Sequence, residues 1–188
     1  MTDLQLADGC RRQEGPSQEA LYRRFGPITF GVCRRYAADV MEAEDLHQVG
    51  WMRVFDKINL YKGDGSLEGW LRRVFVTVCL NAFQKRRRRA KWMEPLPGEA
   101  HLDVRDDTPT PDFLAQERLV TMIAALPEGA RVVFNLFAVE GYTHTEIAQQ
   151  LSISEANSRQ QLLRARTTLA RRLSATQNHT TVSTHHPL

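Results

Sequence analysis

The chain has 188 residues, enough for one ordinary domain or two small ones, and its hydrophobic content of 42% is normal for a soluble protein. No stretch approaches the ~20 consecutive apolar residues that a membrane-spanning helix needs, and the first ten residues lack the apolar core of a secretory signal. The formal net charge of +3 is strongly segregated: residues 72–91 hold eight basic residues and no acid, whereas residues 94–117 hold seven acids and one base. A second basic segment follows at residues 155–172, so the pattern indicates two polyanion-binding surfaces joined by an acidic tether.

Two amphipathic helices are predicted near the N-terminus, after residues 1–16, which look unstructured and are expected to be disordered. Ser17 can cap the first helix. Its apolar residues recur at spacings of four, three and four: Leu21, Phe25, Ile28 and Val32. The second helix is expected to begin near Glu42, with the apolar residues Leu46, Val49, Met52, Phe55 and Ile58. Trp51 and Met52 are adjacent and point in different directions, so at least one can remain exposed as a docking residue, although both can also be core.

A glycine-containing loop at residues 61–66 precedes a third, long helix that ends in the basic run 85–89. The apolar side of this helix carries Leu67, Trp70, Leu71, Val74, Val78 and Ala82. The basic residues of the loop and helix can line a phosphate track, and Tyr61, Trp70 and Phe75 supply aromatic rings on which unstacked bases can stack, although core is favoured for Trp70. Three helices of this length can enclose a small core, which predicts a first domain at residues 17–91.

Residues 92–112 are rich in Pro, Asp and Gly, lack helical periodicity and are predicted to be an acidic linker. Helices resume with Leu114, Leu119, Ile123 and Leu126, and Pro127 opens another that carries Val133, Phe134 and Phe137. A second domain is predicted at residues 113–174, followed by a disordered tail at 175–188. No strand pattern or internal repeat is present, so the predicted fold class is all-α, with two small helical domains joined by a flexible linker.

Residues 141–173 have the pattern of a helix-turn-helix, a unit that fits one helix into the DNA major groove. Gly141 suits a helix end, and Thr143 with Glu146 forms a T-x-x-E capping box. Residues 152–154 break the helix, and Ser154 suits the N-cap of the next one. The first helix has an apolar face of Ile147, Ala148 and Leu151, and the second is expected to bury Leu162, Ala165, Leu169 and Leu173.

The second helix of this unit carries side chains suited to reading DNA. Asn and Gln can pair with adenine edges and Arg with guanine, and each good pair contributes roughly 1–3 kcal/mol of discrimination. The first turns hold Asn157, Ser158, Arg159, Gln160 and Gln161. Phosphates, which supply affinity without reading sequence, are better matched to Arg164, Arg166, Arg171 and Arg172. The alternative is an amphipathic hairpin with a merely solvated polar face, but the capping box, the turn and the basic helix together favour DNA binding.

Catalytic or metal chemistry has little support in the sequence. There is no Gly-rich phosphate loop, H-E-x-x-H helix or nucleophile elbow, so we expect no enzyme activity, cofactor or metal. Three histidines of the C-terminal tail, His179, His185 and His186, can trap a metal weakly, but a disordered tail is favoured. The three isolated cysteines are typical of reduced thiols in a cytoplasmic protein, and we expect Cys33 and Cys79 to fill core space, whereas Cys10 lies in the N-terminal segment.

Two separated stretches resemble the same family. The second region of bacterial sigma factors is similar to AEDLHQVGWMRVF, which is followed here by a loop, WL and a basic helix. Their fourth region is similar to LPEGARVVFNLFAVEGYTHTEIAQQLSISEANSRQQLLRAR. Together, over residues 17–173, the stretches resemble the extracytoplasmic-function (ECF) group of the sigma-70 family, which keeps only these two domains. The resemblance implies a sigma factor that binds RNA polymerase core and directs promoter-specific transcription initiation.

The resemblance also implies a role for each surface. The helix that docks on the β′ clamp helices of polymerase would use Asp45, Leu46, Gln48, Val49 and Arg53, with Val49 standing where the family usually has Glu. The loop 62–66 would capture a flipped base of the melted minus-10 element, and the residues that would hold this element and the DNA upstream of it are Tyr61, Lys62, Ser66, Arg72, Arg73, Asn81, Lys85, Arg86, Arg87 and Arg88. The recognition helix would read the minus-35 element with Ser154, Glu155, Asn157, Ser158, Arg159, Gln160, Gln161, Arg164 and Arg166.

Further partners follow from the same resemblance: the β flap of polymerase, promoter DNA and, as for many relatives, an anti-sigma factor. The acidic linker would run through polymerase where nascent RNA later passes. The main alternative is a stand-alone helix-turn-helix regulator, in which residues 17–90 serve for dimerisation or sensing and the DNA site is a palindrome. A third interpretation is an interaction protein that binds polymerase or an anti-sigma partner without reading DNA.

Overall fold

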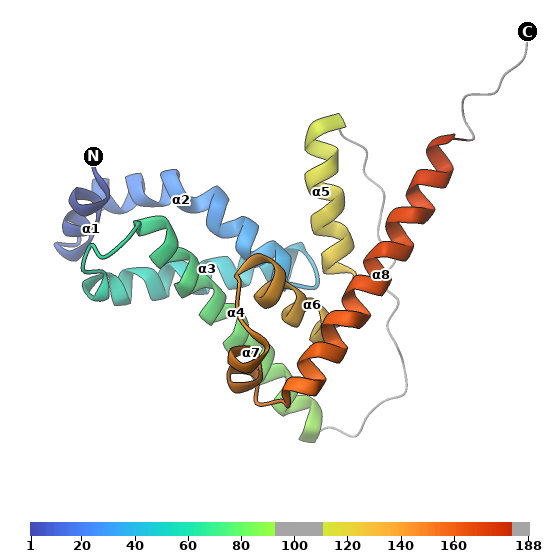
Figure 1. Cartoon of the computed structure of the whole chain (residues 1–188). Helices are drawn as coiled ribbons and strands as arrows, with labels where there is room; N and C mark the ends of the chain where they lie inside the picture. Colours follow the sequence, from blue (N-terminus) through green and yellow to red (C-terminus); the bar gives the residue numbers. More distant parts are fainter. Residues whose placement is uncertain (93–110, 182–188) are drawn as a thin grey trace, which may run out of the picture. The chain divides into compact units, whose positions relative to one another are not determined.

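The chain divides into two helical units, Met1–Gly98 and Glu99–Leu188, in the computed structural model, which describes residues 1–92 and 111–181 (Figure 1). The described residues form helices and connecting loops without a strand, which confirms the all-α fold class. Residues 93–110 of the predicted linker and residues 182–188 of the predicted tail lie outside the described residues. At the edges of the predicted linker, Trp92 ends one helix and Pro111 begins another.

The N-terminal unit is built from consecutive helices. In chain order these are α1 (Asp3–Arg11), α2 (Gly15–Tyr36), α3 (Val40–Lys57), the short 3-10 helix η1 (Ile58–Leu60) and α4 (Leu67–Trp92). Helices α2, α3 and α4 pack on one another, and α1 packs on α2 and η1.

The first residues of the chain are helical, so the prediction of disorder for residues 1–16 was wrong. Thr2 opens α1 with a capping box: its hydroxyl accepts from the Gln5 amide, and the Gln5 side chain accepts from the Thr2 amide. One side of α1 is apolar, and Leu6, Ala7 and Cys10 are each at most 3% exposed. Burial of this side against the rest of the unit stabilises a helix that is too short to be stable alone.

Helix α2 begins earlier than predicted. Its N-cap is Glu14, and Pro16 occupies the first turn, where its missing N–H has no cost. Ser17 is therefore not the cap: it is buried, and its hydroxyl donates to the Glu14 carboxylate at 3.1 Å. Helix α1 crosses α2 so closely here that a Cβ on Gly9 would overlap the Ser17 side chain.

The closest approach between α3 and α4 is at Gly50, where a Cβ would overlap the ring of Phe75. The Phe75 ring is fully buried. Cys33 and Cys79 are buried as predicted, and Cys10 is buried as well. The remaining larger side chains of this core are Leu21, Phe25, Val32, Tyr36, Leu46, Trp51, Val54, Ile58, Tyr61, Leu67, Leu71, Val76, Leu80 and Phe83.

The rotation of the helices about their axes differs from the predicted one. Helix α3 begins at Val40, capped by Asp39, and turns Ala43, Leu46, Gly50, Trp51 and Val54 inward. Three residues predicted to be apolar contacts are instead exposed by 41–67%: Ile28, Val49 and Met52. Trp51 therefore belongs to the core, and Met52 is the exposed member of that pair.

The C-terminal unit comprises α5 (Pro111–Ala124), α6 (Glu128–Phe134), the π-helix η2 (Asn135–Val139), α7 (His144–Leu151) and α8 (Glu155–Thr181). One buried cluster joins three of these helices through Ile123, Leu126, Ala130, Ala165 and Leu169, and Met122 and Phe134 pack against it. Helix α8 continues to Thr181, which corrects the predicted start of the disordered tail at residue 175.

Two leucines predicted on the apolar faces of this unit, Leu119 and Leu173, are both 48% exposed. Helix α8 turns Arg172 toward α5 in place of Leu173. The Arg172 guanidinium donates to the carbonyl oxygens of Met122 and Ala125 at 3.4 and 3.3 Å. The arginine thus satisfies carbonyls at the C-terminal end of α5, where a cation is also favoured by the helix dipole.

Candidate nucleic-acid interface

The turn between α7 and α8 has the geometry that the sequence predicted. Gly141 has φ +78°, and Thr143 begins α7 with a capping box. The Glu146 carboxylate accepts from the Thr143 amide at 2.8 Å, and this bond, with one from the Thr143 hydroxyl, lowers the pKa of Glu146. Ser152 ends α7 in the left-handed region at φ 51°, and the Ser154 hydroxyl accepts from the Asn157 amide at 3.1 Å. Local hydrogen bonds therefore fix both ends of the turn.

Side chains of α7 and α8 join the two helices directly. The Thr145 hydroxyl donates to Glu155 at 2.8 Å, and His144 Nδ1 lies 2.9 Å from the Ser158 hydroxyl. Ser158 is fully buried, so its predicted contact with DNA was wrong. Glu155 also accepts from Arg159 at 2.8 Å, and the bonds from Thr145 and Arg159 lower the pKa of its carboxyl. Glu155 thus orients Arg159 on α8.

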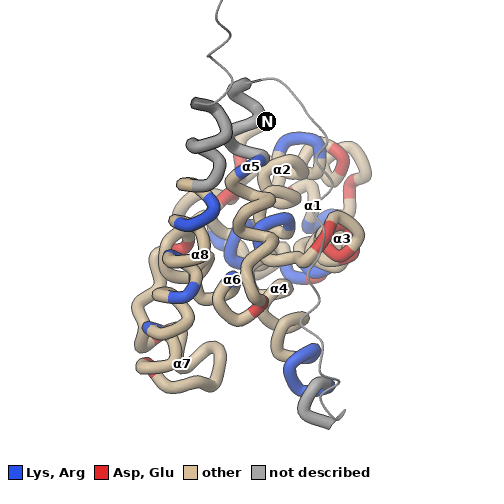
Figure 2. Tube along the Cα trace, turned by 90° about the vertical axis from the view of Figure 1, so that its right-hand side faces the viewer, with Lys and Arg blue, Asp and Glu red and all other residues tan. Residues whose placement is uncertain are grey.

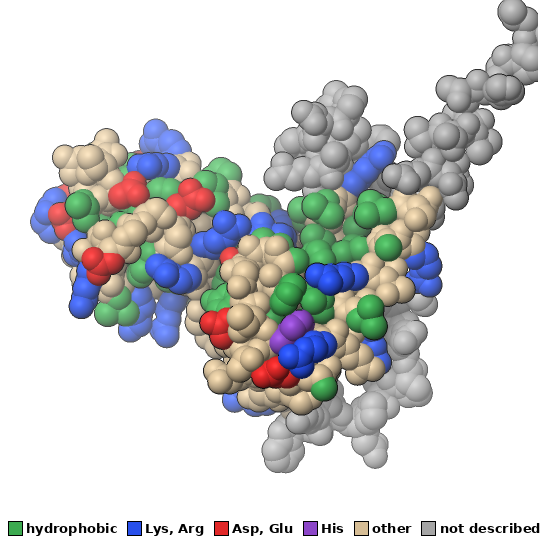
Figure 3. Space-filling model, viewed as in Figure 1, with side chains coloured by type: hydrophobic (Ala, Val, Ile, Leu, Met, Phe, Trp, Pro, Cys, Tyr) green, Lys and Arg blue, Asp and Glu red, His purple; other side chains and the backbone are tan. Residues whose placement is uncertain are grey.

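The outward side of α8 carries most of the predicted DNA-reading residues. Arg159, Gln160, Arg164 and Arg166 are exposed. Leu163, which was not among the predicted DNA-binding residues, is 65% exposed on the same side. An apolar side chain there is suited to contact a thymine methyl group. On the face of this unit shown in Figure 3, basic side chains lie beside exposed hydrophobic ones.

Other predicted residues of α8 are turned toward the protein. Asn157 and Gln161 are half-buried and hydrogen-bonded to each other at 3.4 Å. Gln161 also lies against α6, within 3.6 Å of the position of a Cβ on Gly129. Arg166 lies over the Phe137 ring at 5.7 Å, and Phe137 stacks on His144. These contacts hold the helix-turn-helix together beside its exposed face. Arg172, which was predicted to contact phosphate, instead bonds to carbonyl oxygens near the end of α5.

Two hydrogen bonds made by residues of the loop between η1 and α4 help to order it. Gly63 and Gly65 both have φ +87°, a conformation that favours glycine. Tyr61 is 3% exposed and its hydroxyl donates to the Gly65 carbonyl at 3.0 Å, so its ring offers no free face to a base. Ser66 caps α4 by accepting from the Gly69 amide at 3.1 Å. Lys62 is exposed at the tip.

Helix α4 has one polar side that faces solvent, the α4 basic face: Arg73, Thr77, Asn81, Lys85 and Arg88. Lys85 lies twelve positions after Arg73 in the helix, so this face is about 18 Å long before its last turn. Figure 2 shows the Lys and Arg residues gathered at the C-terminal end of α4 and spaced along α8. Three arginines predicted to contact DNA, Arg72, Arg86 and Arg87, are only half exposed, and Arg86 forms an ion pair with Glu42 of α3.

The exposed side of α3, the α3 docking face, comprises Met41, Asp45, Gln48, Val49, Met52 and Arg53. Met41 and Met52 are 77% and 67% exposed, an unusual position for large apolar side chains that indicates a contact surface. Leu46 is 7% exposed and faces the core, so its predicted role in docking was wrong. The rotation of α3 described above places the two methionines on the exposed side and Leu46 on the buried side.

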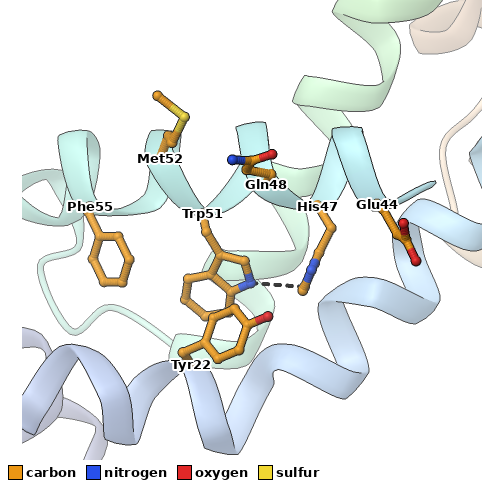
Figure 4. A pocket seen from close by; sticks show the side chains of 7 residues that line it. All are labelled: Tyr22, Glu44, His47, Gln48, Trp51, Met52 and Phe55. Atoms are coloured by element: carbon orange, nitrogen blue, oxygen red, sulfur yellow. Dashed lines mark hydrogen bonds between the residues drawn. The ribbon is translucent and has the colours of Figure 1, made fainter. Parts of the chain in front are cut away.

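A groove of about 460 Å³ separates α2 from α3, lined by Tyr22, Glu44, His47, Gln48, Trp51, Met52 and Phe55 (Figure 4). Trp51 Nε1 donates to His47 Nε2 at 2.9 Å. Because an indole N–H can only donate, His47 is neutral with its proton on Nδ1. Burial lowers the pKa of His47, against a smaller opposite effect of its hydrogen bond to the Gly26 backbone.

Within residues 1–92 and 111–181, no group of three or more His, Cys, Asp or Glu side chains could hold a metal ion. None of the helices in those ranges combines the length and hydropathy that a membrane span requires.

Comparisons with known proteins match both units. A family model described as Sigma-70 region 2 matches residues 21–89, and one described as Sigma-70, region 4 matches residues 116–169. The ECF RNA polymerase sigma factor SigE of Mycolicibacterium smegmatis is 28% identical over 156 residues, which are 80% of this chain and 59% of that protein. The RNA polymerase sigma-H factor of Pseudomonas aeruginosa is 24% identical over 173 residues, 87% of this chain and 90% of that protein.

A solved structure shares the fold. The sigma factor RpoE from Bartonella quintana, crystallised with the anti-sigma factor NepR, has a TM-score of 0.52 and 17% sequence identity, and the match covers 83% of this chain and 96% of that one. With regions 2 and 4 matched in order and relatives named as ECF sigma factors, the chain belongs to the sigma-70 family of RNA polymerase sigma factors, in its ECF group.

Proposed function

We propose that this chain binds RNA polymerase core and directs it to promoters through two DNA contacts, one in each unit. The observation that carries the proposal is the presence of a separate exposed basic surface in each of the two units: the outward side of α8 and the α4 basic face. Recognition of two promoter elements by one chain requires such a pair. A stand-alone helix-turn-helix regulator requires only one exposed basic surface.

The outward side of α8 would read the minus-35 element. Arg159 and Gln160 are exposed in the first turns of α8, the part of a recognition helix that contacts base edges. Arg164 and Arg166 lie further along and match the spacing of phosphates better. Of the other residues predicted here, Ser154, Glu155, Asn157 and Gln161 would support the orientation of α8 more than they contact bases.

The loop at residues 61–66 and the α4 basic face would hold the melted minus-10 element. Opening a duplex costs about 1–2 kcal/mol per base-pair step, and holding an extruded base offsets part of that cost. Lys62 and Ser66 lie at the loop, whereas Arg73, Asn81 and Lys85 extend along α4 and would follow the phosphates of one strand. Arg72, Arg86 and Arg87 would support this surface from its edge.

The α3 docking face would bind the β′ clamp helices. Its two exposed methionines supply apolar area, and Asp45, Gln48 and Arg53 supply polar contacts around it. Flexible methionine side chains adapt well to a partner surface. Val49 is 52% exposed here, so a residue that replaces the family's usual glutamate would extend the apolar part of the contact.

The remaining partners follow from the family. The C-terminal unit would contact the β flap of polymerase, and the acidic segment between the units would occupy the path of nascent RNA. A sigma factor acts in the cytoplasm, where polymerase is, and an anti-sigma factor is the expected inhibitor, as the pairing of RpoE with NepR illustrates for a protein of this fold. The catalysis belongs to polymerase, and this chain supplies promoter choice.

The test is run-off transcription with purified core polymerase and a library of genomic fragments, with and without this chain. We expect discrete transcripts only when the chain is present. The double variant Arg159→Ala, Gln160→Ala should lose promoter choice while it still binds core. Arg23→Ala is the matched control, because Arg23 forms an exposed ion pair with Glu19 on α2, away from the proposed surfaces.

Binding of the free chain provides a second criterion. We expect little specific affinity for duplex promoter DNA without core polymerase, because the two contacts are used together on melted DNA. Tight protection of a palindrome by the free chain, unchanged by added core, would instead identify a stand-alone regulator.

A further inference from the structure

Helix α1 contacts both ends of the loop 61–66, although the two segments are far apart in sequence. At the beginning of the loop, the Arg11 guanidinium donates to the Tyr61 carbonyl. At its end, the Asp3 carboxylate accepts from the Leu67 amide at 3.2 Å. Between them, the Leu4 side chain lies over Gly63, 2.8 Å from the position that a Cβ would take there. Three residues of one helix thus hold the beginning, the middle and the end of the loop.

The loop needs such support because of its composition. Two of its six residues are glycines at φ +87°, and glycine loses more conformational freedom on ordering than any other residue. Its internal bonds are the Tyr61 hydroxyl to the Gly65 carbonyl and the Ser66 cap on α4. The Leu67 amide belongs to the first turn of α4, whose N–H groups have no partner within the helix, and a carboxylate is the favoured acceptor there.

Helix α1 is itself firmly attached to the unit. Its buried side and the close crossing at Gly9 hold it against α2. Asp3 makes a further ion pair with Arg24 of α2 at 3.1 Å, and Arg11 pairs with Asp8 within α1. Asp3 and Arg11 are therefore each held by an ion pair in addition to their hydrogen bond to the loop, so α1 links the loop to α2.

We propose that α1 is a positioning element for minus-10 recognition, with Asp3 and Arg11 as positioning residues that fix the base-capturing loop without touching DNA. This inference rests on the proposed function of the loop. A loop held in one conformation loses less freedom when it receives an extruded base, so the ordering cost is met on folding and not on promoter opening. Release of the loop should weaken binding of the minus-10 element and reduce discrimination among its bases, while leaving the minus-35 contact intact.

The experiment compares holoenzymes made with wild-type chain, with the double variant Asp3→Ala, Arg11→Ala, and with the control Arg12→Ala. Arg12 is the C-cap of the same helix but pairs with Glu14 on the surface, so its replacement should leave open-complex formation unchanged. Open complexes are measured by permanganate reactivity of unpaired minus-10 thymines on a promoter selected by the run-off library. We expect roughly a tenfold or greater loss of open complex for the double variant, the effect of losing two hydrogen bonds that involve charged groups.

Two further measurements exclude a merely structural effect. Substitution of each minus-10 base should reveal a flatter preference in the double variant, whereas core affinity and the effect of minus-35 substitutions should match wild type. Asp3→Asn retains an acceptor for the Leu67 amide and should recover most of the activity. Unchanged minus-10 preference in the double variant, or an equal loss of core binding, would overturn the inference. Failure of the wild-type holoenzyme to depend on any minus-10 base would instead overturn the proposed function.

Discussion

Replacement of Gly50 by alanine tests how closely α3 packs on α4. An ideal Cβ at this position lies within 3 Å of three ring atoms of Phe75, and that ring is fully buried among core side chains. Overpacking of a core costs about 1–3 kcal/mol. Alanine recovers about 1 kcal/mol of helix propensity relative to glycine. The net expectation is a loss of up to about 2 kcal/mol in the unfolding free energy of the N-terminal unit.

Tryptophan fluorescence in a urea titration measures this loss in the correct unit, because Trp51, Trp70 and Trp92 all lie in the N-terminal unit. Gly31→Ala on α2 is the matched control: a Cβ there meets nothing within 4 Å, so this variant should gain about 0.5–1 kcal/mol. A cycle with Phe75→Leu should show a coupling of at least about 0.5 kcal/mol, because the smaller side chain makes room for the methyl group. Equal stability of the two alanine variants, or an additive cycle, would refute the close-packing argument.

Three further predictions concern burial and exposure at the proposed sites. The pKa of His47 is lowered by burial in the folded protein. Its contribution to the stability of the N-terminal unit is therefore fully present at pH values above the ordinary histidine pKa of about 6.5. This stability is lost as the pH falls below that value, because the unfolded chain takes up a proton first. Urea titrations between about pH 7 and pH 5 should show this slope in wild type and a flatter one in His47→Gln, whereas equal slopes would assign the dependence to other groups. Ser158→Ala should lower the stability of the C-terminal unit by about 1–2 kcal/mol in thermal unfolding and weaken DNA binding equally for all sequences. Arg159→Ala should leave stability unchanged and reduce discrimination at one base of the minus-35 element about tenfold in run-off assays. Met52→Ala should weaken binding to RNA polymerase core in a fluorescence anisotropy assay without a change in melting temperature. Leu46→Ala should instead cost about 2–5 kcal/mol of stability. A larger loss of stability for Met52→Ala than for Leu46→Ala would reverse the assignment of the two faces of α3.

The sequence predicted the helix-turn-helix almost completely because its signals are local. The capping box at Thr143 and Glu146, the break at Ser152 and the cap at Ser154 each depend on residues within four positions of one another. Such hydrogen bonds form in the same way whatever surrounds them, so they can be read from the order of residues alone. The all-α class followed from the same kind of evidence.

The rotation of each helix about its axis was less predictable, because it depends on the neighbours of the helix. In α3, Leu46 and Met52 both fit an apolar pattern, but Gly50 allows α4 to approach on one side only, and that choice exposes Met52. For the same reason, the burial of Tyr61 and Ser158 was not predicted. Both are polar enough to be expected at the surface, but the structure gives them internal hydrogen-bond partners, Gly65 and His144.

Helix α1 was missed although a signal was present. Thr2 and Gln5 form the T-x-x-Q version of a capping box, and Leu6, Ala7 and Cys10 follow at helical spacing. A nine-residue helix has little stability of its own, so a pattern this short is a weak signal of a helix. Its stability comes from contacts with α2 and with the loop before α4. The residues of that loop lie fifty or more positions further along the chain, so a local sequence pattern does not reveal these contacts.

The internal use of arginines has a consequence for how promoter binding responds to electrolyte. Each phosphate neutralised by a cationic side chain releases condensed counterions, and the logarithmic slope of affinity against salt counts those events. Arg172 is bonded to carbonyl oxygens of α5 and Arg86 to Glu42, so both are already neutralised or satisfied inside the protein. The measured slope should therefore be shallower than the arginine content of the two basic segments implies. Its magnitude should correspond to the number of cationic side chains that face water.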